Sequence, residues 1–222
     1  MLQQSTLDFL SQLNNNNERD WFHANKSTYQ TAVKDMQTLL QEIINELSAK
    51  YIIFEGTEPK KCMFRIFRDV RFSKDKRPYK PNFGAVIAPT GRKSLRAGFY
   101  IHIEPNDKSF WAGGTFQPPK EQLQSIRQEI DYNGQILEKI LQNSDFKQKF
   151  PTLVGEQLKT SPKGYPLNHT YIKYLRYKSH IVTKSFKDNA CLKPDFVSKT
   201  LKVYETIKPL NDFLNTAMGF EP

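Results

Sequence analysis

Apolar residues recur at helical spacing in the first quarter of the chain. Leu7, Leu10 and Leu13 follow a capping sequence at Ser5, which predicts a short helix that stops at the asparagine run 14–17. A longer stripe at three- and four-residue steps then predicts one amphipathic helix over residues 17–48, through Phe22, Tyr29, Val33, Met36, Leu40, Ile43 and Leu47. Each helix has one apolar face, so both are expected to pack on a core.

The apolar period changes from helical to alternating near residue 62. One face of the segment 62–72 would carry Cys62, Phe64, Ile66, Val70 and Phe72, which predicts a strand with one packed side. Short β-rich runs follow at 82–88, 98–103 and 109–113, separated by turn sequences. Together these runs predict an antiparallel meander.

Helical patterns return after the meander. Pro118-Pro119 opens one helix, a β-rich run follows at 178–186, and a helix over 195–218 closes the chain, with Pro209 as a kink or a new start. This order predicts an α+β fold, with an antiparallel β meander packed against N-terminal and C-terminal helices. No linker or low-complexity run divides the chain, so a single domain over residues 1–222 is expected.

Charge and composition bear on the partners and the cellular location of the protein. The chain has 33 Lys and Arg against 23 Asp and Glu, a net charge of +10 that attracts anionic partners and leaves nucleic acid as an alternative. No apolar stretch approaches the roughly 20 residues that cross a bilayer. The start of the chain lacks the plan of a signal peptide, so no membrane association and a cytoplasmic location are expected. Cys62 and Cys191 lack the paired spacing of a zinc site and are interpreted as buried or half-buried thiols.

The segment 65–80 has seven cationic residues in sixteen positions, offset only by Asp69 and Asp75. The planar fork of arginine binds carboxylate or phosphate through two parallel hydrogen bonds, and lysine adds a mobile charge. The segment therefore predicts an anion-binding motif, whose candidate binding residues are Arg65, Arg68, Arg71 and Lys76. The structural alternative is a solvated basic edge held by ion pairs.

Arg68 is in phase with the apolar face of the predicted strand, so its side chain is expected to point toward the core. An unpaired charge in such a place is costly, and Arg68 therefore requires a partner. Glu104 or Asp69 would be a structural partner, and a bound anion would be a functional one.

The same segment matches a family signature. Its residues run Arg65-Ile-Phe-Arg68-Asp69-Val-Arg71-Phe72, followed by Asp75-Lys76-Arg-Pro-Tyr79. Further matches are Asn-Asn-Asn-Glu-Arg-Asp-Trp-Phe ending at Phe22, Tyr100-Ile-His102-Ile-Glu104-Pro, Gly113-Gly114 and Pro162-Lys163-Gly164-Tyr165. The chain thus resembles the bacterial and fungal domain of unknown function 2461 family over nearly its whole length. The resemblance implies no activity, substrate or catalytic residue.

Tyr100, His102 and Glu104 share one face of the run 98–103 if it is a strand. A histidine beside a carboxylate suits general acid–base work, so His102 and Glu104, with Tyr79, are the catalytic candidates. The alternative is that they form structural hydrogen bonds to the basic segment. Two ligands are too few for a metal site, and no metal or cofactor is expected. Gly113-Gly114 suits either a tight turn or a close backbone approach to a ligand.

The segment 171–178 interleaves aromatic and cationic residues, which suits stacking on nucleic acid bases as well as ordinary helix packing. The leading hypothesis for the chain is a site for a phosphorylated or carboxylated small molecule. The alternatives are a nucleic-acid-binding module, and a structural or partner-binding domain whose motif is a buried ion network. The sequence does not distinguish an enzyme from a binding protein.

Overall fold

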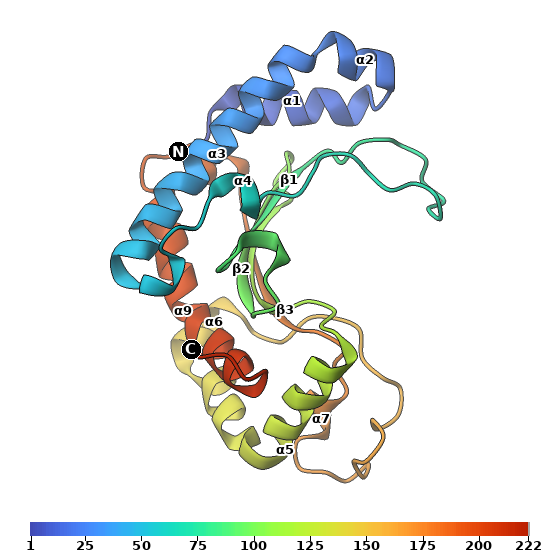
Figure 1. The fold of residues 1–222 in the computed structure, drawn as a ribbon, viewed down its shortest axis with the longest axis vertical. Coiled ribbons are helices and arrows are strands. Elements are labelled where there is room, and N and C mark those ends of the chain that lie inside the picture. Colours follow the sequence, from blue (N-terminus) through green and yellow to red (C-terminus); the bar gives the residue numbers. More distant parts are fainter. Residues whose placement is uncertain (222) are drawn as a thin grey trace. The chain divides into compact units, whose positions relative to one another are not determined.

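The computed structural model describes residues 1–221. Its α-helices are α1 (Gln4–Asn15), α2 (Arg19–Ala24), α3 (Lys26–Lys50), α4 (Pro59–Cys62), α5 (Lys120–Gln142), α6 (Ser144–Lys149), α7 (Ile172–Leu175), α8 (Asp188–Cys191) and α9 (Phe196–Ala217). The strands β1 (Phe83–Ile87), β2 (Gly98–Ile103), β3 (Ser109–Thr115) and β4 (His180–Phe186) form one antiparallel sheet in the order β1-β2-β3-β4 (Figure 1). Short 3-10 helices are η1 (Ile52–Phe54) and η2 (Gly91–Lys93). The predicted α+β class is confirmed.

One predicted helix is two in the structure. The helix expected over 17–48 divides into α2 and α3 at Asn25, whose backbone (φ −105°, ψ 21°) leaves the helical region. The carbonyl of Trp21 accepts hydrogen bonds from both the backbone N–H (3.0 Å) and the side-chain amide (2.8 Å) of Asn25 at the break. In α9, by contrast, Pro209 lies inside one continuous helix.

The described chain separates into two compact units. Unit 1 comprises Met1–Ser94, Tyr100–Trp111 and Ser185–Lys202, and unit 2 comprises Leu95–Phe99, Ala112–Lys184 and the segment from Val203 onward. The expectation of a single domain over residues 1–222 stays a prediction.

The helical stripes form the core of unit 1. Leu10 and Leu13 of α1 and Met36, Leu40 and Ile43 of α3 are fully buried, as their spacing predicts. Each such side chain contributes roughly 1.5–3 kcal/mol by leaving water. Both cysteines of the chain, Cys62 and Cys191, are also buried in this unit.

The part of β2 that lies in unit 1 alternates between a buried and a half-buried face. Ile101 and Ile103 of β2 lie in the core, whereas Tyr100 and His102, which alternate with them, lie on the opposite face and are partly accessible. Next to Ile103 in the chain, Glu104 continues the accessible row. The alternation predicted from the sequence thus places the three polar residues on one face.

Unit 2 contains a kinked helix. Asn133 interrupts α5 with a non-helical backbone (φ −126°, ψ 25°), where the sequence shows Asn-Gly. The next residue, Gly134, is buried against the ring of Tyr171, and a side chain there would overlap that ring. The absence of a side chain at residue 134 therefore lets the segment that leads into α7 pack closely on α5.

Candidate functional site

Residues 63–80, called the basic hairpin below, form a long irregular loop with two arms between α4 and β1 (Figure 1). The predicted strand over 62–72 is therefore wrong. The arms meet only through isolated pairing, as at the antiparallel bridge between Phe67 and Tyr79. The returning arm contains Pro78, which has no N–H to donate, and this interrupts a regular ladder.

The predicted packed face is also only partly buried. Ile66 is buried (2% exposed), but Phe64 is 39% exposed and Phe72 is 97% exposed. The chain turns back at Val70, whose carbonyl accepts a hydrogen bond from the Ser73 N–H (3.3 Å). Period-two alternation ends where a strand ends, so Phe72 is placed at the tip of the hairpin in solvent.

The basic hairpin is fixed to the N-terminal helices at Tyr79. The Tyr79 N–H donates to Oδ1 of Asn17 (3.0 Å), and Nδ2 of Asn17 donates to the Tyr79 carbonyl (3.1 Å). The Tyr79 ring is 3% exposed and stacks on Phe22, with the ring centroids 4.0 Å apart. Phe67 contacts both rings. Asn17 thus bonds the hairpin backbone as a neighbouring strand would, and Phe22 holds the Tyr79 ring by stacking.

This position gives Tyr79 a packing role. Within residues 1–221, no hydrogen bond or ring contact joins Tyr79 to the other two catalytic candidates, His102 and Glu104. Its proposed part in catalysis stays a prediction without a supporting contact.

Arg68 is paired across the hairpin. Its side chain is 22% exposed and forms an ion pair with Asp75, so neither of the expected partners, Glu104 and Asp69, is its partner. Asp75 also accepts from Arg77 (2.8 Å). These bonds, that from Arg77 first, hold the pKa of Asp75 well below its ordinary value, so the carboxylate is charged at neutral pH.

Charged side chains at the tip of the hairpin bond to other groups of the tip. Arg71 donates two bonds to Asp69, Nε to Oδ1 (3.0 Å) and Nη2 to Oδ2 (2.7 Å), and these bonds lower the pKa of Asp69. Lys76 donates from Nζ to the Val70 carbonyl (3.1 Å). Arg71 remains 77% exposed, so its pair is an open surface pair of small net worth.

At the base of the hairpin, two cations of the described chain lack a carboxylate partner. Lys80 is half-buried, and its pKa is lowered by burial and then by the charges of Arg65 and Arg68. Its ammonium lies 5.7 Å from the ring centroid of Phe64. Among residues 1–221, neither Lys80 nor Arg65 forms an ion pair with a carboxylate. Two cations at the base, Lys80 and Arg65, therefore lack a carboxylate ion-pair partner among the described residues.

A hydrogen-bonded row follows β2 beside this base. The hydroxyl of Tyr100 and Nδ1 of His102 are 2.9 Å apart, and Nε2 of His102 and Oε2 of Glu104 are 3.0 Å apart. If Nε2 donates to the carboxylate, Nδ1 accepts from the Tyr100 hydroxyl, and both bonds are satisfied by a neutral imidazole. The ring of Phe110 stacks on His102 at 4.6 Å. The row can pass a proton between its ends.

Tyr100 is the inner end of this row. Burial, and then the charge of Glu104, raise its pKa to about 12, so the phenol keeps its proton at neutral pH. The ring lies over Gly84 of β1, where a side chain would overlap the hydroxyl. Gly84 is thus the reason that a tyrosine fits at this place on the sheet.

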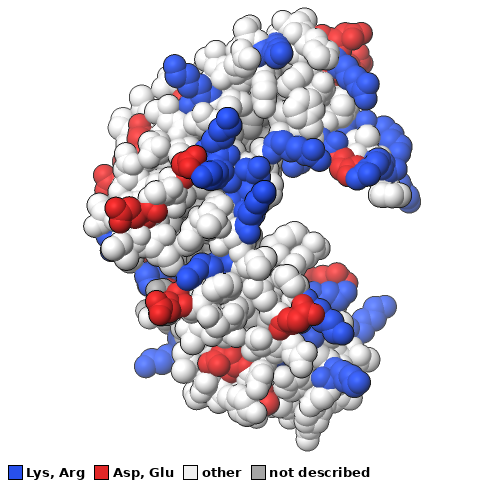
Figure 2. Space-filling model, in the orientation of Figure 1, with Lys and Arg blue, Asp and Glu red and all other residues white. Residues whose placement is uncertain are grey.

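The row and the base of the hairpin are neighbours. The ring of Phe64 contacts both the Tyr100 ring (centroids 6.3 Å apart) and the Lys80 ammonium. The pKa of Arg77 is raised mainly by Asp75 and also by the charge of Glu104. Figure 2 shows Lys and Arg side chains gathered along the hairpin, with acidic side chains among them. The two predicted site segments therefore meet at the base, whereas the hairpin tip extends into solvent.

Comparison with known proteins gives a family. A family model described as "Conserved hypothetical protein (DUF2461)" matches residues 5–213. The chain belongs to the DUF2461 family. Searches of curated proteins and of solved structures each found no match. Within the described residues of this DUF2461 chain, no group of three or more His, Cys, Asp or Glu is arranged to hold a metal ion. No helix among them is long and apolar enough to span a bilayer.

The glycine pair of this DUF2461 chain serves packing in unit 2. A side chain at Gly113 would overlap Ile207 of α9, and one at Gly114 would overlap the carbonyl of His180 on β4. Gly114 also has a φ of +112°, which side chains disfavour. Close strand and helix packing accounts for both glycines.

Three further residues matter to the site and were not singled out as site residues from the sequence. Asn17 lies in the Asn-Asn-Asn-Glu-Arg-Asp-Trp-Phe match that supported the DUF2461 resemblance, which is the signal that marks it. Lys80 was one of seven cations, and Gly84 one of ten glycines. Their roles depend on contacts with residues elsewhere in the chain, which the local sequence pattern does not show.

Proposed function

We propose that the chain binds a phosphate- or carboxylate-bearing small molecule at the base of the basic hairpin. The observation that carries this proposal is the half-buried Lys80, whose pKa is lowered by burial and by two neighbouring guanidinium groups. Holding three cations together costs free energy, which a bound anion would recover. Arg65 and Lys80 supply the free donors, and Arg68 supplies a charge already oriented by Asp75.

The row of Tyr100, His102 and Glu104 gives this site an acid–base group. A ligand held beside Phe64 would lie near the Tyr100 hydroxyl, which Phe64 contacts through its ring. When Nε2 of His102 carries the ring hydrogen, the Tyr100 hydroxyl donates a hydrogen bond to Nδ1 of His102. The lone pairs of the Tyr100 oxygen can then accept a hydrogen bond from a ligand. The Tyr100 oxygen can take a proton from the ligand as its own hydroxyl proton passes to Nδ1 of His102, which leaves an imidazolium beside the Glu104 carboxylate, as hydrolysis or transfer would require.

The test is titration of isotope-labelled protein with inorganic phosphate and with citrate, followed by the NMR signals of the arginine and lysine side chains. R65M and K80M should each weaken binding by about tenfold or more, because each removes a charge-assisted bond. K74M is the matched control, since Lys74 is an exposed lysine of the same hairpin. Binding also should raise the pKa of Lys80 toward its ordinary value. Equal weakening in all three variants would contradict the proposal.

Nucleic acid binding is a second candidate, favoured by the open tip. Phe72 is 97% exposed and Arg71 is 77% exposed, so neither lies in an enclosed pocket. A two-armed ribbon fits the major groove of a duplex, and exposed aromatic rings stack on unpaired bases. Extended positive surfaces are also typical of proteins that follow a phosphate backbone.

The two candidates predict opposite results at the tip. Nucleic acid binding would be measured by the fluorescence anisotropy of a labelled DNA duplex and of a labelled single strand. If the tip binds nucleic acid, K74M and F72A weaken binding, although both leave phosphate binding at the base unchanged. If neither variant changes the anisotropy titration, the nucleic acid candidate is rejected and the small-molecule proposal is unaffected.

A further inference from the structure

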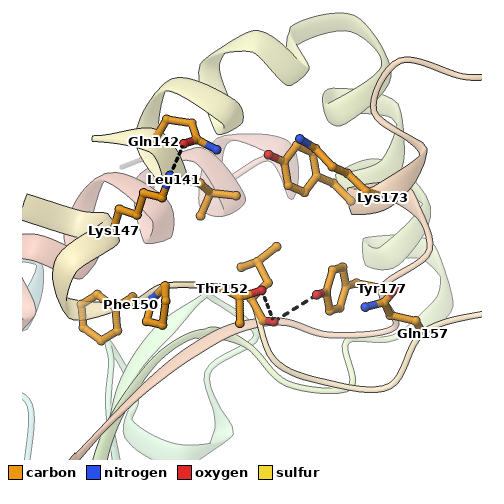
Figure 3. A pocket seen from close by; sticks show the side chains of 11 residues that line it. Leu141, Gln142, Lys147, Phe150, Thr152, Gln157, Lys173 and Tyr177 are labelled. Carbon is orange, nitrogen blue, oxygen red and sulfur yellow. Dashed lines mark hydrogen bonds between the residues drawn. The ribbon is translucent and has the colours of Figure 1, made fainter. Parts of the chain in front are cut away.

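Unit 2 contains a pocket of about 260 Å³ that is independent of the basic hairpin. Figure 3 shows side chains from the end of α5, from α6, from the connection after it and from the α7 region around an open space. The residues that form its wall are Leu141, Gln142, Lys147, Phe150, Pro151, Thr152, Leu153, Gln157, Lys173, Tyr174 and Tyr177. Its volume equals that of about nine water molecules at about 30 Å³ each, slightly below the range for drug-sized ligands.

One side of the pocket is apolar and rigid. Phe150 and Leu153 are 1% and 4% exposed, so their positions are fixed by the core of unit 2. The hydroxyl of Tyr177 donates to the Leu153 carbonyl (3.0 Å), which orients the tyrosine ring along the wall (Figure 3). Because Phe150 and Leu153 are almost wholly covered, the apolar surface that a flat group would contact comes from the half-buried Leu141 and the exposed Pro151, which also line the pocket.

The opposite side carries positive charge. Lys173 is bonded to Glu138 (2.8 Å), which raises the pKa of the lysine, and its charge is therefore largely offset. Lys147 is different, because its ammonium donates to the neutral amide oxygen of Gln142 (3.1 Å; Figure 3). Across residues 1–221, no carboxylate forms an ion pair with Lys147. The pocket thus presents one uncompensated cation beside apolar surface.

We propose that this pocket binds a small carboxylate with a single-ring or similarly compact apolar body. The carboxylate would replace Gln142 as the partner of Lys147, and the apolar body would pack against Leu141 and Pro151. One uncompensated ammonium matches one carboxylate charge, whereas a phosphate monoester, with up to two charges, needs more donors.

The segment 171–178, whose aromatic and cationic pattern suits stacking on nucleic acid bases or ordinary helix packing, forms part of the pocket wall. In the structure it packs in the core and borders the pocket. Leu175 is fully buried, whereas Lys173, Tyr174 and Tyr177 line the pocket. The ammonium of Lys173 lies 4.7 Å from the Tyr174 ring centroid, so the cation holds the ring at the wall.

The test uses benzoate as the probe and benzamide as its neutral counterpart, titrated into the full chain and followed by backbone amide NMR shifts. Benzoate is expected to shift signals of the pocket residues with saturation, and benzamide to bind about tenfold more weakly or not at all. K147M should lose most of the benzoate affinity. L141W keeps the charge but fills the space, and it should abolish binding.

K139M is the matched control, since Lys139 is an exposed lysine of α5 that does not line the pocket. It should bind benzoate as the unmodified chain does. Equal loss in K139M and K147M would show a general charge effect and overturn the proposal. Benzamide binding as tight as benzoate, or benzoate shifts spread over surface lysines without saturation, would overturn it as well. A folded spectrum of each variant confirms that a loss comes from the pocket.

Discussion

His180 lies wholly out of solvent in unit 2, and only one of its ring nitrogens has a partner. Nε2 donates to the carbonyl of Tyr174 (3.1 Å), and Nδ1 is buried without a hydrogen bond. A proton added at Nδ1 would find no acceptor. Burial, and secondarily the nearby charge of Arg127, lower the pKa of His180 to about 4.

This pKa predicts acid sensitivity. Below pH 6.5 the unfolded chain takes up a proton on this histidine that the folded chain refuses until about pH 4. The free energy of unfolding should therefore fall by about 3 kcal/mol on this account between those values, and be unaffected by it above pH 6.5. Urea unfolding at several pH values measures the slope. H180Q should remove this part of the slope, and the variant H23Q of an exposed histidine should keep it.

The residue that fits at position 84 depends on the Tyr100 side chain that lies over it. A methyl group at Gly84 would overlap the Tyr100 hydroxyl, so G84A is expected to destabilise unit 1 by about 1–3 kcal/mol. In a Y100F background the oxygen is gone, and the same change should cost clearly less. A double-mutant cycle by chemical denaturation measures the coupling. Additive costs would mean that the hydroxyl does not limit this position.

At the scale of elements, the basic hairpin depends on one side chain from the N-terminal region. Asn17 satisfies both backbone groups of Tyr79. N17A should therefore cost about 1–2 kcal/mol and leave the hairpin less protected. Amide hydrogen exchange at Tyr79 should accelerate more than exchange in α3. N15A, which changes an exposed asparagine of the same run, should leave both unchanged.

Elements whose pattern is local were predictable from the sequence. β2 occurs at the predicted residues 98–103, and the leucines of α1 are buried as their spacing requires. The hairpin was not predictable, because its alternation up to Phe72 imitates a strand. Two features make this segment a hairpin: Pro78 lacks an N–H, and Tyr79 is bonded to the distant Asn17. A bond between residues so far apart in sequence leaves no trace in the spacing of apolar residues.

The candidate site was predictable in part for the same reason. The strand alternation of residues 100–104 correctly places Tyr100, His102 and Glu104 in one row. Arg68 was correctly expected to need a partner, but Asp75 becomes that partner only because the chain turns back at Val70. Side-chain pairs across an irregular turn depend on its geometry, which the sequence pattern does not encode.

At the scale of the whole molecule, the net charge of +10 should make any binding of DNA strongly salt-dependent. The logarithm of the affinity for a duplex should fall linearly with the logarithm of salt concentration, by about 0.9 for each phosphate neutralised. Removing a contacting tip lysine, as in K74M, should reduce that slope by about 0.9. K34M on α3 lowers the net charge equally. The same slope change in both variants would assign binding to the overall field and not to the hairpin.

The buried state of the two cysteines has a practical consequence. Burial raises the pKa of both thiols to about 11, so almost no reactive thiolate exists at neutral pH. A cysteine introduced in place of the exposed Phe72 would therefore react with a maleimide dye or a nitroxide while Cys62 and Cys191 stay unlabelled. The single substitution F72C, with both native cysteines left in place, is thus enough to attach a probe that reports on the hairpin tip alone.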